Sequence, residues 1–93
     1  MPVRVVVPAV LQPLAGGQRV LVLDPPPRTV GDAMRAVRAR YPGVYDRVIT
    51  EAAEVRPHVN LFVGDASIRD RGGLDAPVPD GEDVYILPAV SGG

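Results

Sequence analysis

The chain of 93 residues contains no cysteine and no tryptophan, and it has a single histidine, His58. Without cysteine the protein cannot form a disulfide bond, hold a metal ion through thiolates or use a thiol as a nucleophile. His58 has no second histidine to complete a metal-binding or catalytic set, so we expect it to have a structural role. These absences disfavour a self-contained enzyme and a resident metal ion or cofactor.

An excess of charge of one sign is also missing. The formal net charge is -1, and acidic and basic residues are interleaved along the chain. Phosphate backbones need a basic surface, and stacked bases need aromatic rings, of which the chain has three tyrosines and one phenylalanine. We therefore expect no nucleic-acid partner. No apolar run is long enough to cross a bilayer and no charged-then-apolar leader is present, so we expect a cytoplasmic protein without membrane contact.

The sequence does have enough apolar residues, 46% of the total, for one modest core and hence one domain. Alternating apolar residues over 2–7 predict a half-buried strand. A glycine-containing turn over 15–18 leads into a second apolar segment over 19–23, whose length suits a pairing partner. The chain is therefore predicted to begin with a β-hairpin.

A helix is predicted over residues 30–40. Thr29 is a good N-cap, apolar residues recur at helical spacing, and Pro42 stops further helix. Three consecutive prolines within residues 24–28 predict a stiff, extended connector before this helix. Residues 44–57 have a mixed pattern that predicts a short helical turn and a loop.

The remaining strands are predicted over residues 58–63 and 83–87, with a short edge segment near Ile68. This order of elements predicts an α+β fold in which a mixed sheet of four to five strands curves around one main helix, in a domain of residues 1–87. The predicted core comprises Val3, Val5, Val7, Val20, Val22, Val30, Met34, Val37, Val59, Leu61, Val84 and Ile86.

Residues 88–93 are predicted to form a flexible C-terminal tail, because Pro88 is expected to end the last strand. The tail ends in Gly92 and Gly93, which have no Cβ, so its backbone and carboxylate could enter a narrow channel of another protein. Fully extended, the tail would reach about 20 Å. The alternative is an ordinary frayed chain end, since the sequence contains 10 glycines.

Several of these segments resemble segments of one protein family. They are Val3–Val7, Gly16–Gly17, the helix after Thr29, Val59–Asn60, Gly72–Leu74 and the terminal Leu87–Gly93. In these segments the sequence resembles the ubiquitin-like sulfur carriers of the MoaD and ThiS family, most closely the CysO-type members. The resemblance covers nearly the whole chain and implies the β-grasp, or ubiquitin-like, fold.

The resemblance also implies a function. In that family an E1-like enzyme of the MoeB/ThiF type, using ATP and magnesium, adenylates the C-terminal glycine, which is then converted to a thiocarboxylate that donates sulfur to a biosynthetic enzyme. Carried onto this sequence, Gly93 holds the activated carboxyl group, and Gly92, Ser91 and Val90 are the tail residues that a partner recognises. The chain would be a protein substrate that binds no cofactor. Its pathway stays open among cysteine, a sulfur-containing cofactor and a secondary metabolite.

Two other functions remain open. A ubiquitin-like modifier would share the tail and the activation step but would be ligated through Gly93 to lysines of target proteins. A non-covalent β-grasp interaction module would have a glycine tail that is incidental. Intact mass and tail deletion distinguish these alternatives from a carrier.

The strand pattern also predicts a docking surface for a partner. If the core face is assigned as above, Val6, Phe62, Tyr85 and Leu87 share the opposite face of the sheet, beside the tail. An exposed apolar cluster there would mark a partner site. The alternatives are that loops cover this face or that the register of one strand differs.

Overall fold

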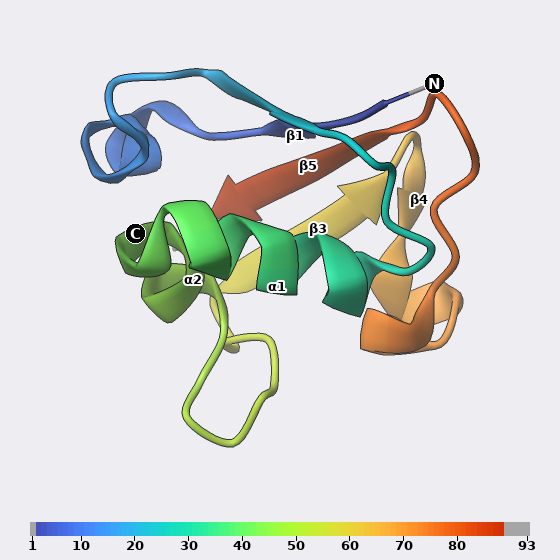
Figure 1. Ribbon diagram of the computed structural model, residues 1–93. Helices are drawn as coiled ribbons and strands as arrows, with labels where there is room; N and C mark the ends of the chain where they lie inside the picture. Colours follow the sequence, from blue (N-terminus) through green and yellow to red (C-terminus); the bar gives the residue numbers. More distant parts are fainter. Residues whose placement is uncertain (1, 89–93) are drawn as a thin grey trace.

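A computed structural model describes residues 2–88 and has one five-stranded mixed sheet with helices packed on one face (Figure 1). The strands are β1 (Val3–Val6), β2 (Val20–Leu23), β3 (Val59–Val63), β4 (Ala66–Ser67) and β5 (Asp83–Pro88). Their order in the sheet is β2-β1-β5-β3-β4, so the last strand of the chain lies at the centre. β1 and β5 are parallel, and the other neighbours are antiparallel. This arrangement confirms the predicted β-grasp fold.

The main helix, α1 (Val30–Arg40), has the predicted bounds. The hydroxyl of Thr29 accepts a hydrogen bond of 3.1 Å from the backbone N–H of Asp32, which satisfies one of the free donors of the first turn. Asp32 also lies near the positive end of the helix dipole. The helix therefore begins where its cap residue dictates.

The second helix, α2 (Pro42–Val48), follows after a single residue. Proline is favoured in a first helical turn because its missing N–H is not needed there. Val44 and Val48 are buried, so α2 contributes to the core although the sequence pattern predicts only a short helical turn. The loop after it is closed by a bridge between Ile49 and Val55.

Short 3-10 helices occupy three connections: η1 (Ala9–Ala15), η2 (Ile68–Asp70) and η3 (Gly73–Asp75). η1 lies between β1 and β2, where the sequence predicts only a turn near residue 16. Leu11 and Ala15 are buried in this segment, and Gly16, with φ of 64°, ends it. The hairpin is therefore joined by a packed segment rather than by a tight turn.

The predicted core is confirmed outside β2. In β1, β3, β5 and α1 every predicted core side chain is at most 5% exposed. In β2 the prediction is wrong by one residue: Val22 is 49% exposed and Val20 is half-buried, whereas Leu21 and Leu23 are buried. The cause is the pairing of Leu21 with Val5 in β1, because residues directly opposite each other share a face.

The other strands differ from the predictions in detail. β5 continues to Pro88, which lies opposite Val59, so Pro88 is part of the strand rather than the first residue after it. β3 is internal in the sheet, between β5 and β4. The expected edge segment near Ile68 is the two-residue β4 just before it.

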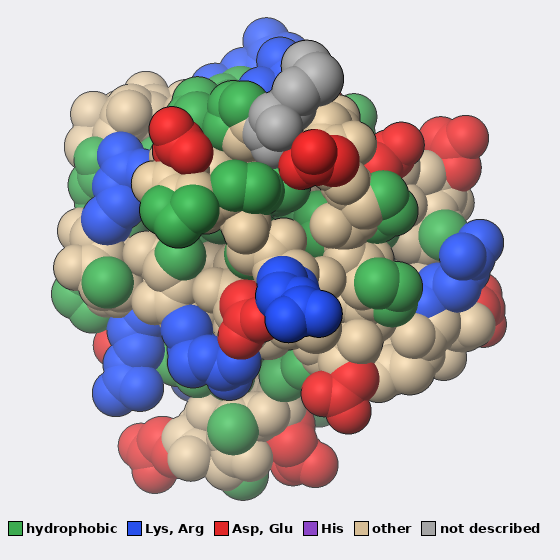
Figure 2. All heavy atoms as spheres, turned by 45° about the vertical axis from the view of Figure 1, so that its right-hand side comes forward, with side chains coloured by type: hydrophobic (Ala, Val, Ile, Leu, Met, Phe, Trp, Pro, Cys, Tyr) green, Lys and Arg blue, Asp and Glu red, His purple; other side chains and the backbone are tan. Residues whose placement is uncertain are grey.

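Charges are spread over the surface. In the view of Figure 2, basic and acidic side chains are interspersed with apolar ones over the face that is shown. Among residues 2–88, no helix is long and apolar enough to span a membrane.

Candidate functional site at the root of the C-terminal tail

The C-terminal end of β5 fixes the point from which the last five residues start. Leu87 lies opposite Asn60, and Pro88 lies opposite Val59. The first half of β5 is paired with β1, whereas Val84–Pro88 are paired with β3, so the end of β5 is held in the sheet by β3 alone. The predicted tail residues Val90, Ser91, Gly92 and Gly93 lie outside the described residues. What the structure shows of this site is therefore its base.

The four predicted docking residues lie on the sheet face opposite α1, here called the outer face. Val6 and Phe62 are both directly opposite Tyr85, so the three side chains form a row across β1, β5 and β3. Leu87 lies two residues beyond Tyr85 and is 44% exposed. The neighbouring residues Val5, Val84 and Leu61 are buried, as the alternation of strands requires.

The outer face is larger than the sequence predicts. The corrected register of β2 places Val20 opposite Val6 and Val22 opposite Arg4. Both valines therefore join the outer face and extend its apolar row to the edge of the sheet. Periodicity could not reveal this, because Val20, Leu21, Val22 and Leu23 are all apolar and either alternate pair could face the core.

One ion pair marks the end of the outer face that is farther from the tail. The guanidinium of Arg4 donates hydrogen bonds of 3.0 and 2.9 Å to the two carboxylate oxygens of Asp83, at the start of β5. The hydroxyl of Tyr85 lies 3.4 Å from the same carboxylate. The hydrogen bond and the charge of Asp83 raise the pKa of Arg4. The face is thus charged where β5 begins, and near the end of β5 it has Leu87 beside the uncharged Asn60.

The described residues offer little catalytic chemistry. Residues 2–88 contain no group of three histidine or carboxylate side chains that could hold a metal ion. His58, for which we expect a structural role, is exposed one residue before β3 and makes no side-chain hydrogen bond to another residue of this range.

Comparison with known proteins places these features in context. Residues 5–93 match the ThiS family. Sulfur carrier protein CysO of Mycobacterium tuberculosis is 36% identical over 95 residues, covering all of both chains. Small archaeal modifier protein 3 of Haloferax volcanii is 38% identical over 65 residues, covering 70% of each chain.

Solved structures agree with the sequence matches. The crystal structure of CysO from Mycobacterium tuberculosis has a TM-score of 0.86 and 33% identity, covering 95% of this chain and 99% of that one. A chain from the Amycolatopsis orientalis BexX/CysO complex also has a TM-score of 0.86, with 34% identity, covering 98% of this chain and 99% of that one.

Proposed function

The chain belongs to the ThiS family, and from this premise we propose that it is a sulfur carrier whose working group is the C-terminal carboxylate of Gly93. The observation that carries the proposal is the full-length similarity to the carrier CysO. The protein acts as a substrate of partner enzymes and is not itself a catalyst. ATP and magnesium belong to the activating partner, which is an E1-like enzyme of the MoeB/ThiF type.

The proposed reaction has two steps. A carboxylate oxygen of Gly93 attacks the α-phosphorus of ATP, so that an acyl adenylate forms and pyrophosphate leaves. Sulfide then attacks the carbonyl carbon, the new carbon–sulfur bond replaces the bond to AMP, and a thiocarboxylate remains. A carboxylate is a poor electrophile, and the adenylate supplies the leaving group that it lacks. The thiocarboxylate then donates its sulfur to a biosynthetic acceptor enzyme.

The position of β5 supports this role. A partner that receives the chain end must hold the reacting carbon within a few ångströms of its own groups, which is easier when the base of the tail is fixed. β5 provides such a base, because Leu87 and Pro88 are paired with β3. From Pro88 to Gly93 the chain can reach at most about 20 Å, which is enough to enter a channel in a partner.

The outer face is the proposed docking surface for the activating enzyme. Its apolar row, which includes Val6, Phe62, Tyr85 and Leu87, lies on β1, β3 and β5 and extends toward the end of the strand from which the tail leaves. A partner that covers this row would bury apolar area next to the base of the tail, so binding and tail insertion would occur together.

The carrier function is tested by intact mass. The protein is incubated with its activating enzyme, ATP, magnesium and sulfide, and its mass should increase by the difference between sulfur and oxygen, localised to the C-terminal peptide. Gly92→Val, or one leucine added after Gly93, should abolish the change, because a side chain would clash in a channel that fits glycine. Arg47→Gln, on the exposed side of α2, is the matched control and should react normally. A wild-type mass that never changes would refute the proposal.

A second candidate function is that of a protein modifier, and the similarity to small archaeal modifier protein 3 favours it. Both functions need the same tail and the same adenylate, and they differ in the nucleophile that attacks it. With a target lysine, an isopeptide bond forms and AMP leaves. Larger covalent conjugates in cell extracts, lost after Gly93 deletion, would support the modifier, whereas free protein ending in a thiocarboxylate would support the carrier.

A further inference from the structure

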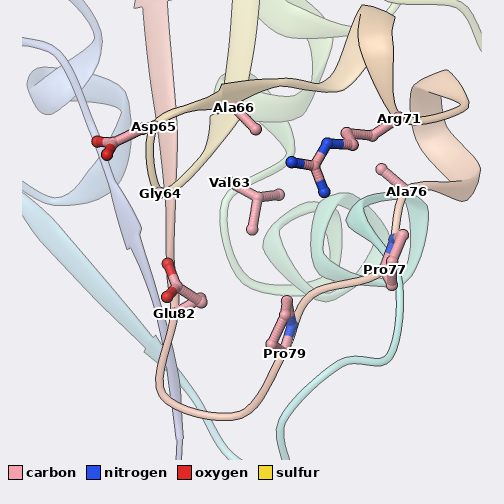
Figure 3. Close-up of a pocket in the computed structure, with 9 residues that line it drawn as sticks. All are labelled: Val63, Gly64, Asp65, Ala66, Arg71, Ala76, Pro77, Pro79 and Glu82. Carbon is pink, nitrogen blue, oxygen red and sulfur yellow. The ribbon is translucent and has the colours of Figure 1, made fainter.

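A hollow lies at the end of the sheet opposite the tail. It has a volume of about 400 Å³, is open to solvent and is lined by the β3–β4 turn, Arg71 and residues of the segment 76–82 that leads into β5 (Figure 3). Glu82 directly precedes β5, whereas the tail follows the last residue of the same strand. The hollow is therefore separated from the base of the tail by the whole length of β5 and is no part of the site described above.

Opposite charges line this hollow. The guanidinium of Arg71 extends into it from one side, while Glu82 lies across from it and Asp65 lies at the outer rim (Figure 3). Within residues 2–88, the side chains of these three residues form no hydrogen bond or ion pair. The charges of Arg71 and Glu82 are thus available to a molecule in the hollow, whereas the carboxylate of Asp65 points away from it (Figure 3).

The wall that carries Glu82 depends on a glycine. Gly64 has a φ of +56°, which favours glycine, and a Cβ there would lie 2.6 Å from Oε2 of Glu82, so the Glu82 side chain would have to move. The N–H of Gly64 also donates a 3.0 Å hydrogen bond to the carbonyl oxygen of Asp83, the residue after Glu82. The β3–β4 turn and the start of β5 are therefore held together, with the carboxylate of Glu82 lying against backbone.

The rest of the wall of the hollow is apolar. It is formed by Val63, Ala66, Ala76, Pro77 and Pro79. Two of these residues are prolines, which limit the freedom of the segment before β5. A volume of about 400 Å³ is at the small end of the range of ligand sites, so the hollow has ample room for a small molecule with a short apolar group.

We propose that this hollow binds a small zwitterion of the amino-acid class. The carboxylate of the ligand accepts two hydrogen bonds from the guanidinium of Arg71, which matches a carboxylate in shape and charge. The ammonium group donates to Glu82, and a short side chain packs on Val63 and the prolines. A simple anion would satisfy Arg71 but would be repelled by Glu82, and a simple cation would have the opposite problem. A molecule with both charges fits both walls.

This inference goes beyond the carrier function and does not depend on it. The ligand would bind at the far end of β5, so the tail and the outer face stay free. The test uses the chain alone, without ATP or an activating enzyme. If no ligand binds in the hollow, the carrier proposal is unaffected. If the mass experiment fails, the proposal of a ligand site in the hollow is unaffected.

The test is a titration of ¹⁵N-labelled protein with L-alanine, in which the amide chemical shifts are measured at each concentration. Saturable shifts are expected at Gly64, Ala66 and Arg71, with a dissociation constant on the order of millimolar, because exposed ion pairs contribute little each. N-acetylalanine lacks the ammonium group and alaninamide lacks the carboxylate, so each should bind about threefold more weakly. Alaninamide is matched to alanine in size and side chain, and N-acetylalanine has the same side chain with a larger amino substituent.

Variants locate the site. Arg71→Gln and Glu82→Gln should each weaken alanine binding about threefold, since each removes one of the two charge-assisted contacts at an exposed site. Arg69→Gln is the control, because this exposed arginine on η2 does not line the hollow. The amide spectrum of each variant shows whether it is folded. The proposal is refuted if alanine causes no saturable shifts in wild-type protein, if N-acetylalanine binds equally well, or if Arg69→Gln has the same effect as Arg71→Gln.

Discussion

Replacing Leu21 and Val22 by alanine, one at a time, tests the strand register that defines the outer face. Leu21 is 1% exposed, and the change removes three carbon atoms at about 0.8 kcal/mol each, to which a cavity term is added, so about 3–4 kcal/mol of stability should be lost. Val22 is 49% exposed, and the change removes two carbons that are already half in water, so the loss should be below about 1 kcal/mol. We therefore predict that Leu21→Ala loses at least about three times as much stability as Val22→Ala.

Urea unfolding followed by circular dichroism measures both losses. In a domain of this size, each kcal/mol changes the melting temperature by about 4–8 °C, so Leu21→Ala should melt at least about 12 °C below wild type and Val22→Ala close to it. The slope of unfolding free energy against urea should be the same for all three proteins, which shows that the unfolded states are comparable. Equal losses, or a larger loss for Val22→Ala, would place Val22 in the core and remove it from the outer face.

Two further predictions follow from other parts of the structure. Leu87→Asp and Phe62→Asp should weaken binding to the activating enzyme at least tenfold in a titration, because a charge would be buried in an apolar contact. Ala39→Asp, on α1, is the control and should not weaken binding. Unchanged affinity of the first two variants would exclude the outer face as the docking surface. The pKa of Asp32 is lowered in the folded protein, mainly by the hydrogen bond that its carboxylate accepts from Arg35. This carboxylate therefore stabilises the fold fully at pH values above its ordinary pKa. The stabilisation is lost as the pH falls through the lowered pKa of the folded state. Below about pH 4, wild-type stability should therefore fall more steeply than that of Asp32→Asn, and parallel pH profiles would contradict this.

Local rules were sufficient to predict the main helix and most strands. The hydroxyl of Thr29 and the stop at Pro42 act within a few residues, so both bounds of α1 follow from the sequence. In β1, valines at alternate positions flank Arg4, whose charge excludes it from the core and so decides which face is buried.

Contacts between residues far apart in the sequence decide those features that local rules do not predict. β2 has four apolar residues in a row, and only its pairing with β1 shows that Leu21 faces the core. The packed segment η1 has a similar cause: Leu11 and Ala15 find places in the core that a turn prediction does not consider. The hollow is still less accessible to sequence rules, because Arg71 and Glu82 are brought together by the path of the segment between them.

The distribution of charge on the outer face has a consequence for how a partner would bind. The ion pair of Arg4 with Asp83 lies where β5 begins, and removing it from water without replacement contacts would be costly. Leu87 lies near the other end, where an apolar surface is favourable to cover. A partner with an apolar patch therefore gains most when it is centred toward Leu87 and leaves the ion pair at its rim. That position places its apolar patch against the base of the tail, so the same contacts that hold the domain would also orient the chain end toward the partner's active site.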